Sequence, residues 1–146
     1  MDVDSNGLGG SLPTEIGLFS DLQELVLYLN IFPGTLPTQL GNLLSLETLY
    51  LSNSQLIGQI PSELFQISTL QYLHLDGNAL TGTVPTQLGT LSSLEGLYLS
   101  FNQFTGTVPS ELGKISTLDI LDLRFNDLTG TIPPEIDQNQ VLVSFP

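Results

Sequence analysis

The side chains best able to do chemistry in this chain recur at intervals of 24 residues. Tyr50, His74 and Tyr98 are spaced in this way, and the same spacing continues in a second set two residues further on. The first set is Asp2, Val26, Tyr50, His74, Tyr98 and Asp122; the second is Asp4, Tyr28, Ser52, Asp76, Ser100 and Arg124. Tyrosine offers a large rigid ring with a polar tip, which suits recognition. If the period is structural, the two sets predict two columns on a binding surface.

Catalysis has one candidate arrangement, the pair of His74 and Asp76. A carboxylate can orient an imidazole that acts as a base. No nucleophile with an oxyanion site accompanies the pair, and the chain has no Cys and no other His. A surface histidine on a strand is the stronger interpretation, so the chain is predicted not to be an enzyme and to need no cofactor.

The charge of the chain restricts its partners. It has 146 residues and a formal net charge of −13, with fifteen acids against Lys114 and Arg124. Such a surface repels phosphate backbones and anionic lipids, so nucleic acid and membrane partners are excluded for this segment. A basic protein, a cation or a neutral glycan remains as a partner. The acids do not converge in one loop as a calcium site requires, so no metal site is predicted.

The elements that must hold these side chains follow from one copy of the repeat, residues 94–117. Tyr98 alternates with two leucines, which indicates a strand with one buried face. Asn102 comes where the chain must turn, and its amide can satisfy backbone groups inside the bend. Residues 104–108 alternate again and predict a second, shorter strand, which Pro109 ends. Apolar residues at 112, 115 and 118 then predict a short helical return.

This pattern recurs along the chain without interruption. Six leucines begin its copies, Leu22, Leu46, Leu70, Leu94, Leu118 and Leu142. The turn position holds Asn in five copies, Asn6, Asn30, Asn78, Asn102 and Asn126. Ser54 is the exception and is expected to break a buried ladder of amides. A constant period of this length is the mark of a solenoid.

The pattern LxxLxLxxNxLxGxIPxxLGxLxx resembles the plant-type leucine-rich repeat. The resemblance implies an α/β solenoid, a right-handed superhelix with a concave parallel β-sheet, short second strands on the flank and 3₁₀ or α turns on the convex side. One domain over residues 1–146 is expected, with about six repeats starting near 22, 46, 70, 94 and 118.

Some positions depart from the pattern of that family. Phe65 replaces the usual Gly in one copy, and Asp137 and Asn139 replace Gly and Leu in the last, where an irregular turn is expected. The period begins at a core position with Met1 and breaks off after another with Phe145. Partial coils are therefore predicted at both ends. The chain is interpreted as a piece of a longer stack, and a complete short protein with simple caps is the alternative.

The resemblance also carries an expected function. Members serve as receptor-kinase ectodomains, polygalacturonase inhibitors or other binding proteins, which implies protein or peptide recognition by the concave face and an extracellular or cell-surface location. The residues predicted to contact the ligand are Val26, Tyr28, Tyr50, His74, Asp76, Tyr98, Phe101, Asp122 and Arg124. The acidic surface favours a basic partner, and a glycan stacked on the tyrosines is an alternative.

A second surface offers a different function. Three Thr-x-Thr pairs on the flanking strands are predicted to stack in register, Thr81 with Thr83, Thr105 with Thr107, and Thr129 with Thr131. Such a grid resembles the arrays of ice-binding β-solenoids, although β-propensity alone also accounts for threonine on an exposed strand.

Acids and amides alternate along two further columns. One column runs through Gln23, Glu47, Gln71, Glu95 and Asp119. Alternation reduces repulsion between neighbouring like charges. The other column runs through Glu15, Gln39, Glu63, Gln87, Glu111 and Glu135. Both columns are interpreted as solvated faces.

Overall fold

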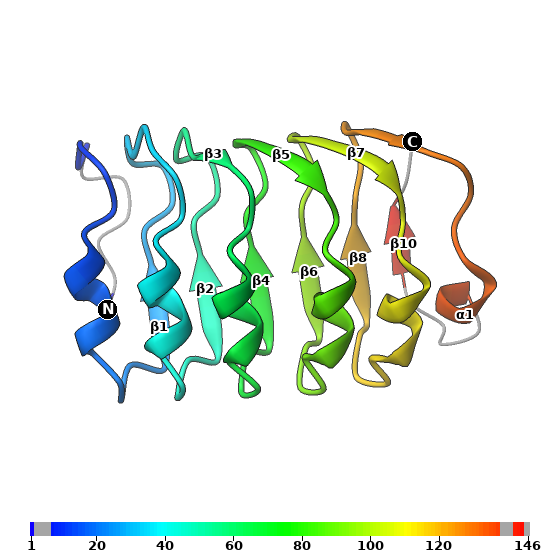
Figure 1. The fold of residues 1–146 in the computed structure, drawn as a ribbon, viewed down its shortest axis with the longest axis horizontal. Coiled ribbons are helices and arrows are strands. Elements are labelled where there is room, and N and C mark those ends of the chain that lie inside the picture. The colour runs from blue at the N-terminus through cyan, green and yellow to red at the C-terminus, as the bar shows by residue number, and fades with distance from the viewer. Residues whose placement is uncertain (2–6, 138–141, 145–146) are drawn as a thin grey trace.

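The computed structural model describes residues 1, 7–137 and 142–144, and in it the chain forms a stack of coils (Figure 1). Each complete coil runs from a strand through a loop to a flanking segment and returns by a short helix (Figure 1). The solenoid predicted from the period is confirmed. No helix among the described residues has the length and apolar character needed to span a bilayer.

Two parallel sheets and a row of short helices make up the stack. The first sheet has the order β1 (Glu24–Val26), β2 (Thr48–Tyr50), β4 (Tyr72–His74), β6 (Gly96–Tyr98), β8 (Ile120–Asp122) and β10 (Leu142–Ser144). The flanking sheet has the order β3 (Ile57–Gly58), β5 (Ala79–Thr83), β7 (Gln103–Thr107) and β9 (Asp127–Thr129). The convex side carries the 3₁₀ helices η1 (Thr14–Leu18), η2 (Thr38–Asn42), η3 (Ser62–Gln66), η4 (Thr86–Thr90) and η5 (Ser110–Lys114), then helix α1 (Pro134–Asp137).

The core is a continuous column of leucines between these layers. Leu73, Leu97 and Leu121 pair in register in the first sheet, and none of them has any exposed surface. Burying each such side chain contributes about 2 kcal/mol. Because every inward position is filled in this way, the outward positions of each strand are held on one common face, here called the concave face.

Asparagine side chains join each coil to the one before it. The Asn102 Oδ1 accepts the Leu80 N–H at 3.0 Å, and its Nδ2 donates to the carbonyls of Leu75 at 2.9 Å and Leu99 at 3.2 Å. These are backbone groups inside a bend, which the strands leave without partners. The same arrangement recurs at Asn78 and Asn126.

Ser54 keeps the ladder intact by a local change of backbone. Its Oγ donates to the Leu27 carbonyl at 3.2 Å, which replaces the missing amide donor. The missing acceptor is replaced by the Ser54 carbonyl, which accepts the Phe32 N–H at 2.9 Å. Gln55, the next residue, has a φ of 60°, a left-handed conformation that is uncommon for a residue with a side chain. The expected break in the ladder is therefore wrong, and strain at Gln55 accompanies the repair.

The flanking sheet has a different register from the first sheet. Thr83 pairs with Thr105, and Thr107 pairs with Thr129, so partners are 22 residues apart rather than 24. The threonine pairs are therefore staggered, and the predicted in-register grid is wrong. The stagger begins in the turn between the two sheets. There the Asn102 Oδ1 accepts the N–H of Leu80, which is 22 residues earlier, so the flanking strands continue with an offset of 22.

The last strand departs from the period in the same way. Leu142 pairs with Ile120 and Val143 with Leu121, again an offset of 22 residues. Val143 packs against the core in place of the residue two positions later. The prediction that Leu142 begins another 24-residue copy is wrong, since the final turn is two residues shorter. Asn6, Asn139 and Phe145, also named from the sequence, lie outside the described residues.

On the convex side, glycine lets successive helices approach closely. A Cβ on Gly89 would lie 2.5 Å from the Glu111 carbonyl oxygen of the next coil. Phe65 stands at the equivalent place in η3, and its ring packs against the core. A groove of about 460 Å³ lies there, lined by Glu63, Phe65, Pro85 and Gln87 among others. The replacement of glycine by Phe65 thus coincides with a local groove in the convex face.

We predict that Asn102→Ala lowers the free energy of unfolding by about 3 kcal/mol, because three buried backbone groups lose their partners. Asn102→Ser should lower it less, since Ser54 shows how a hydroxyl and a carbonyl share the task. Asn42→Ala, on the exposed end of η2, is the control and should change little. Urea unfolding followed by circular dichroism measures all three; equal stabilities for Asn102→Ala and Asn42→Ala would contradict the role of the ladder.

Candidate ligand-binding face

A row of stacked rings crosses the centre of the concave face. Tyr50, His74 and Tyr98 are register partners on β2, β4 and β6. The ring centroids of Tyr50 and His74 lie 3.9 Å apart at 27°, and those of His74 and Tyr98 lie 4.0 Å apart at 11°. These distances are shorter than the strand spacing of about 4.8 Å, so the rings lean toward one another. The row is a rigid aromatic surface that spans three coils.

His74 is part of this surface rather than a base. Burial lowers the pKa of His74 to about 4, against a smaller raising effect of the Asp76 carboxylate. The Nδ1 of His74 lies 3.9 Å from Asp76 Oδ1, which is beyond hydrogen-bond distance. That Asp76 oxygen instead accepts the Ser52 hydroxyl at 2.7 Å. At neutral pH the imidazole is therefore an uncharged ring between two phenols.

Tyr72 extends the ring surface and is not among the residues predicted from the sequence. A Cβ on Gly96 would lie 2.9 Å from ring carbons of both Tyr72 and Tyr98, so the two rings fill the space of the absent side chain. The Tyr72 hydroxyl donates to the Glu95 carboxylate, and this bond raises the pKa of Tyr72. The available signal in the sequence is Gly96 itself, since glycine within a strand often marks a close approach.

Asp122 and Arg124 form a closed pair beside the row. The Arg124 Nε donates to Asp122 Oδ1 at 2.9 Å and its Nη2 donates to Asp122 Oδ2 at 2.8 Å. These side-chain bonds lower the pKa of Asp122, although burial opposes the shift. The only arginine of the chain is thus balanced by a carboxylate on its own coil.

Two phenylalanines form the border of the face where the strands end. Phe101 and Phe125 stack with centroids 4.2 Å apart at 19°, and they are 54% and 59% exposed. Their φ angles of 54° and 55° are left-handed, as are those of Leu29 and Asn53 at the equivalent positions of earlier coils, so this conformation belongs to the turn of the repeat. Two large exposed rings side by side nevertheless form an apolar patch that is available for contact.

The predicted ligand-contacting residues do not all reach this surface. Val26 is 7% exposed and is covered at the edge of β1, where its N–H donates to the Met1 carbonyl. It can offer a ligand almost no surface, so its inclusion was wrong. Tyr28 lies half-buried on the loop after β1. Asp2 and Asp4 lie outside the described residues.

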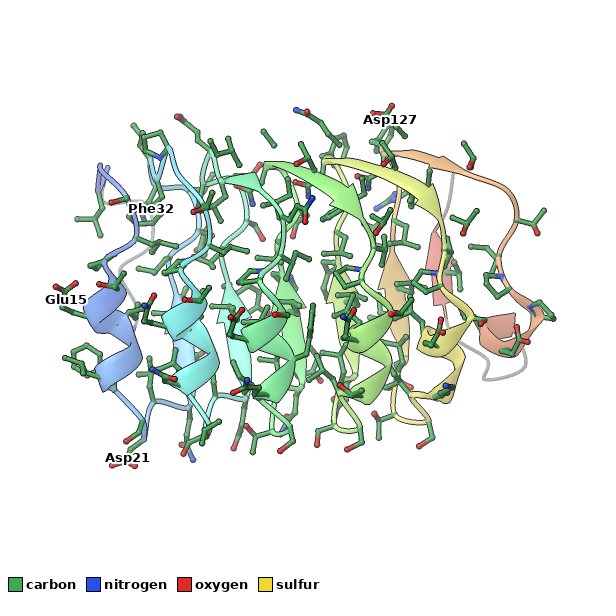
Figure 2. The ribbon with its side chains drawn as sticks, viewed as in Figure 1. Glu15, Asp21, Phe32 and Asp127 are labelled. Atoms are coloured by element: carbon green, nitrogen blue, oxygen red, sulfur yellow. The ribbon has the colours of Figure 1, made fainter. Side chains whose placement is uncertain are left out.

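The flank that carries the threonines is nearly free of charge. The five segments 29–37, 53–61, 77–85, 101–109 and 125–133 contain one charged residue, Asp127 (Figure 2). The hydroxyls of Thr105 and Thr129 donate to the carbonyls of Gly82 at 3.3 Å and Gly106 at 3.1 Å. Two of the six predicted hydroxyls are therefore engaged with backbone, and the remaining surface is neutral and weakly polar.

The described residues contain no group of three or more His, Cys, Asp or Glu side chains placed to hold a metal ion. Two surfaces therefore stand out among the described residues: the concave face, by its aromatic rings, and the flank, by its low charge.

Comparison with known proteins identifies the repeat. Residues 14–133 match the model of a leucine-rich repeat region. The chain belongs to the leucine-rich repeat family. No curated protein matches this leucine-rich repeat chain in sequence.

Solved leucine-rich repeat structures resemble the whole stack. One is the ectodomain of the Arabidopsis thaliana receptor kinase GASSHO1/SCHENGEN3 in complex with CASPARIAN STRIP INTEGRITY FACTOR 2. It is 39% identical in sequence with a TM-score of 0.92, and the match covers 99% of this chain and 17% of that one. Another is the Arabidopsis receptor kinase HAESA in complex with the peptide hormone IDA and the co-receptor SERK1, with 38% identity, a TM-score of 0.88, and coverage of 90% and 22%.

A plant ice-binding protein is similar as well, with 30% identity, a TM-score of 0.91, and coverage of 100% of this chain and 48% of that one. The leucine-rich repeat chain spans between about a sixth and a half of the length of these three structures.

We predict that stability decreases as the pH falls from 7 to 5. His74 has a folded pKa of about 4 against an ordinary value of 6.5, so in this range the unfolded chain binds a proton that the folded chain does not. His74→Tyr should keep the ring row and remove most of this decrease, because His74 is the only histidine. Urea unfolding at pH 7, 6 and 5 measures it, and equal slopes in the two proteins would contradict the assignment.

Proposed function

We propose that this leucine-rich repeat protein is a non-enzymatic binding module that recognises a peptide or protein through its concave face. The observation that carries the proposal is the stacked row of Tyr50, His74 and Tyr98. The leucine core does not require rings at these outward positions, although the rings also stabilise the stack by packing between neighbouring strands.

The row has the physical properties of a recognition surface. Its rings are held before any ligand arrives, so little conformational freedom is lost on binding. Neutral His74 adds no charge to desolvate, and Phe101 with Phe125 extends the apolar area toward one border. A glycan is the second class of ligand for this surface; because the three rings face one another, a sugar would meet mainly their edges and the phenol hydroxyls.

The related structures support the peptide interpretation. GASSHO1/SCHENGEN3 and HAESA are receptor kinases in complex with CASPARIAN STRIP INTEGRITY FACTOR 2 and with the peptide hormone IDA. Both are similar to this chain over at least nine-tenths of its length. A location outside the cell or at its surface accompanies this proposal.

We predict that Tyr50→Ala with Tyr98→Ala abolishes selective peptide binding. The probe is a phage-displayed library of linear twelve-residue peptides, followed by titration of the selected peptides in solution. The control is Phe19→Ala with Leu44→Ala, which removes exposed apolar side chains on the other side of the coils. Peptides that bind both variants as tightly as the unmodified protein would exclude the aromatic row; the same titration with oligosaccharides tests the glycan.

Ice binding through the flank is the second candidate function. The specific observation is the nearly uncharged flank in a chain of net charge −13, together with similarity to a plant ice-binding protein. A neutral surface of methyl and hydroxyl groups can order water without attracting counterions. The stagger of the threonine pairs and the engaged hydroxyls of Thr105 and Thr129 weigh against it.

We predict that, if the flank binds ice, the protein shows thermal hysteresis that Thr105→Lys with Thr107→Lys removes. A long charged side chain disrupts the neutral surface at its centre. Ser92→Lys with Ser116→Lys adds the same charge at exposed positions just after η4 and η5, away from the flank, and should leave the hysteresis unchanged. Nanolitre osmometry measures it, and the absence of hysteresis in the unmodified protein would eliminate this candidate.

A further inference from the structure

The two borders of the concave face differ in chemistry. At the border where the strands begin, Glu47, Glu95 and Asp119 directly precede β2, β6 and β8. At the border where the strands end, Phe101 and Phe125 present a stacked apolar surface. Because the strands are parallel, Glu95 and Asp119 lie together at one border of β6 and β8, and Phe101 and Phe125 lie together at the other.

The acidic border is in contact with the ring surface. Glu95 accepts the hydroxyl of Tyr72, whose ring lies over Gly96 and against Tyr98. Asp119 is near enough to contribute to the raised pKa of Tyr72. Glu47 occupies the same place two coils earlier in the repeat. The predicted role of this column as a plain solvated face is therefore incomplete, since part of it frames the aromatic surface.

These carboxylates have few cations to balance them. Of the two cations in the chain, Arg124 is engaged by Asp122, and Lys114 lies at the end of η5 on the convex side. A cation beside this border is attracted by the carboxylates of Glu95 and Asp119, and a long side chain that carries it can pack its apolar stem along the neighbouring rings. An anionic group would be repelled by both the border and the net charge.

We infer that the partner of the concave face is an extended basic segment. It places a Lys or Arg side chain against Tyr72, Glu95 and Asp119, and an apolar or aromatic side chain against Phe101 and Phe125. The inference rests on the proposed function. It also orients the bound segment, with its basic side chain where the strands begin and its apolar side chain where they end. From Glu95 to Phe101 the backbone spans roughly 15–20 Å, so the two anchors belong to residues about five apart in an extended segment.

The test uses the twelve-residue peptide library on the unmodified protein and on two variants. Glu95→Gln with Asp119→Asn removes two charges from the border, and Gln still accepts the Tyr72 hydroxyl. Glu63→Gln with Glu111→Gln removes two charges from η3 and η5 on the convex side and controls for net charge. The readouts are the frequency of Lys and Arg among selected peptides and the Kd of the best peptide at two salt concentrations.

We expect the unmodified protein and the convex control to select peptides rich in Lys or Arg together with aromatic residues. The border variant should bind the best peptide about fivefold to tenfold more weakly, with a reduced salt dependence, while aromatic enrichment persists. Peptides that depend on Tyr50 and Tyr98 yet show no basic enrichment would overturn this inference alone. Equal weakening in both charge variants would also overturn it. A library that yields no tyrosine-dependent peptide would instead overturn the proposed function.

Discussion

The hydrogen bonds of the buried asparagine ladder are the constraint on which the rest of the structure depends. Each amide joins the bend of its own coil to the preceding one, as Asn102 does with Leu99, Leu75 and Leu80. A shift of one residue in any coil would leave buried backbone groups without partners. The ladder therefore sets the register of the first sheet, and that register brings Tyr50, His74 and Tyr98 into one row.

Three departures from the repeat lie near the same part of the stack. Ser54 in the ladder, Phe65 on the convex side and Gly96 on the concave side lie within three successive coils, while Asp137 and the shortened turn before β10 lie in the last coil. Each of the first three has a structural consequence: a left-handed Gln55, a groove beside η3, and a space filled by the ring of Tyr72. The coils that carry the ring row are thus not determined by stacking alone, which is expected where function competes with regularity.

The sequence predicts the columns of the first sheet well because the period there is the structural repeat. It predicts the flank poorly, since the pairing of β5 with β7 follows the path of the turn and not the period. The burial of Val26 and the bond from its N–H to the Met1 carbonyl arise at the edge of β1, where no complete coil precedes the strand, and no pattern within one repeat contains them. Tyr72 becomes part of the site only through the missing side chain of Gly96 on the neighbouring strand. Periodicity thus predicts in-register neighbours, while contacts that cross between columns require coordinates.

Charge separates the two candidate surfaces more sharply than shape does. Acidic residues occur in the helices and just before the strands of the concave face. The five flank segments between residues 29 and 133 together contain one acid, Asp127. Fifteen acids placed evenly along the chain would put several in these five segments, and the flank has one. The low charge of the flank therefore calls for a structural reason. Threonine hydroxyls that donate to neighbouring carbonyls supply one, because a charged side chain at those positions could not make the same close bond between coils. The rings of the concave face also pack between coils, but that packing does not require the acidic border beside them or the exposed pair Phe101 and Phe125. The stack therefore accounts for part of both surfaces, and the acidic border with the phenylalanine pair is the part that the proposed partner explains.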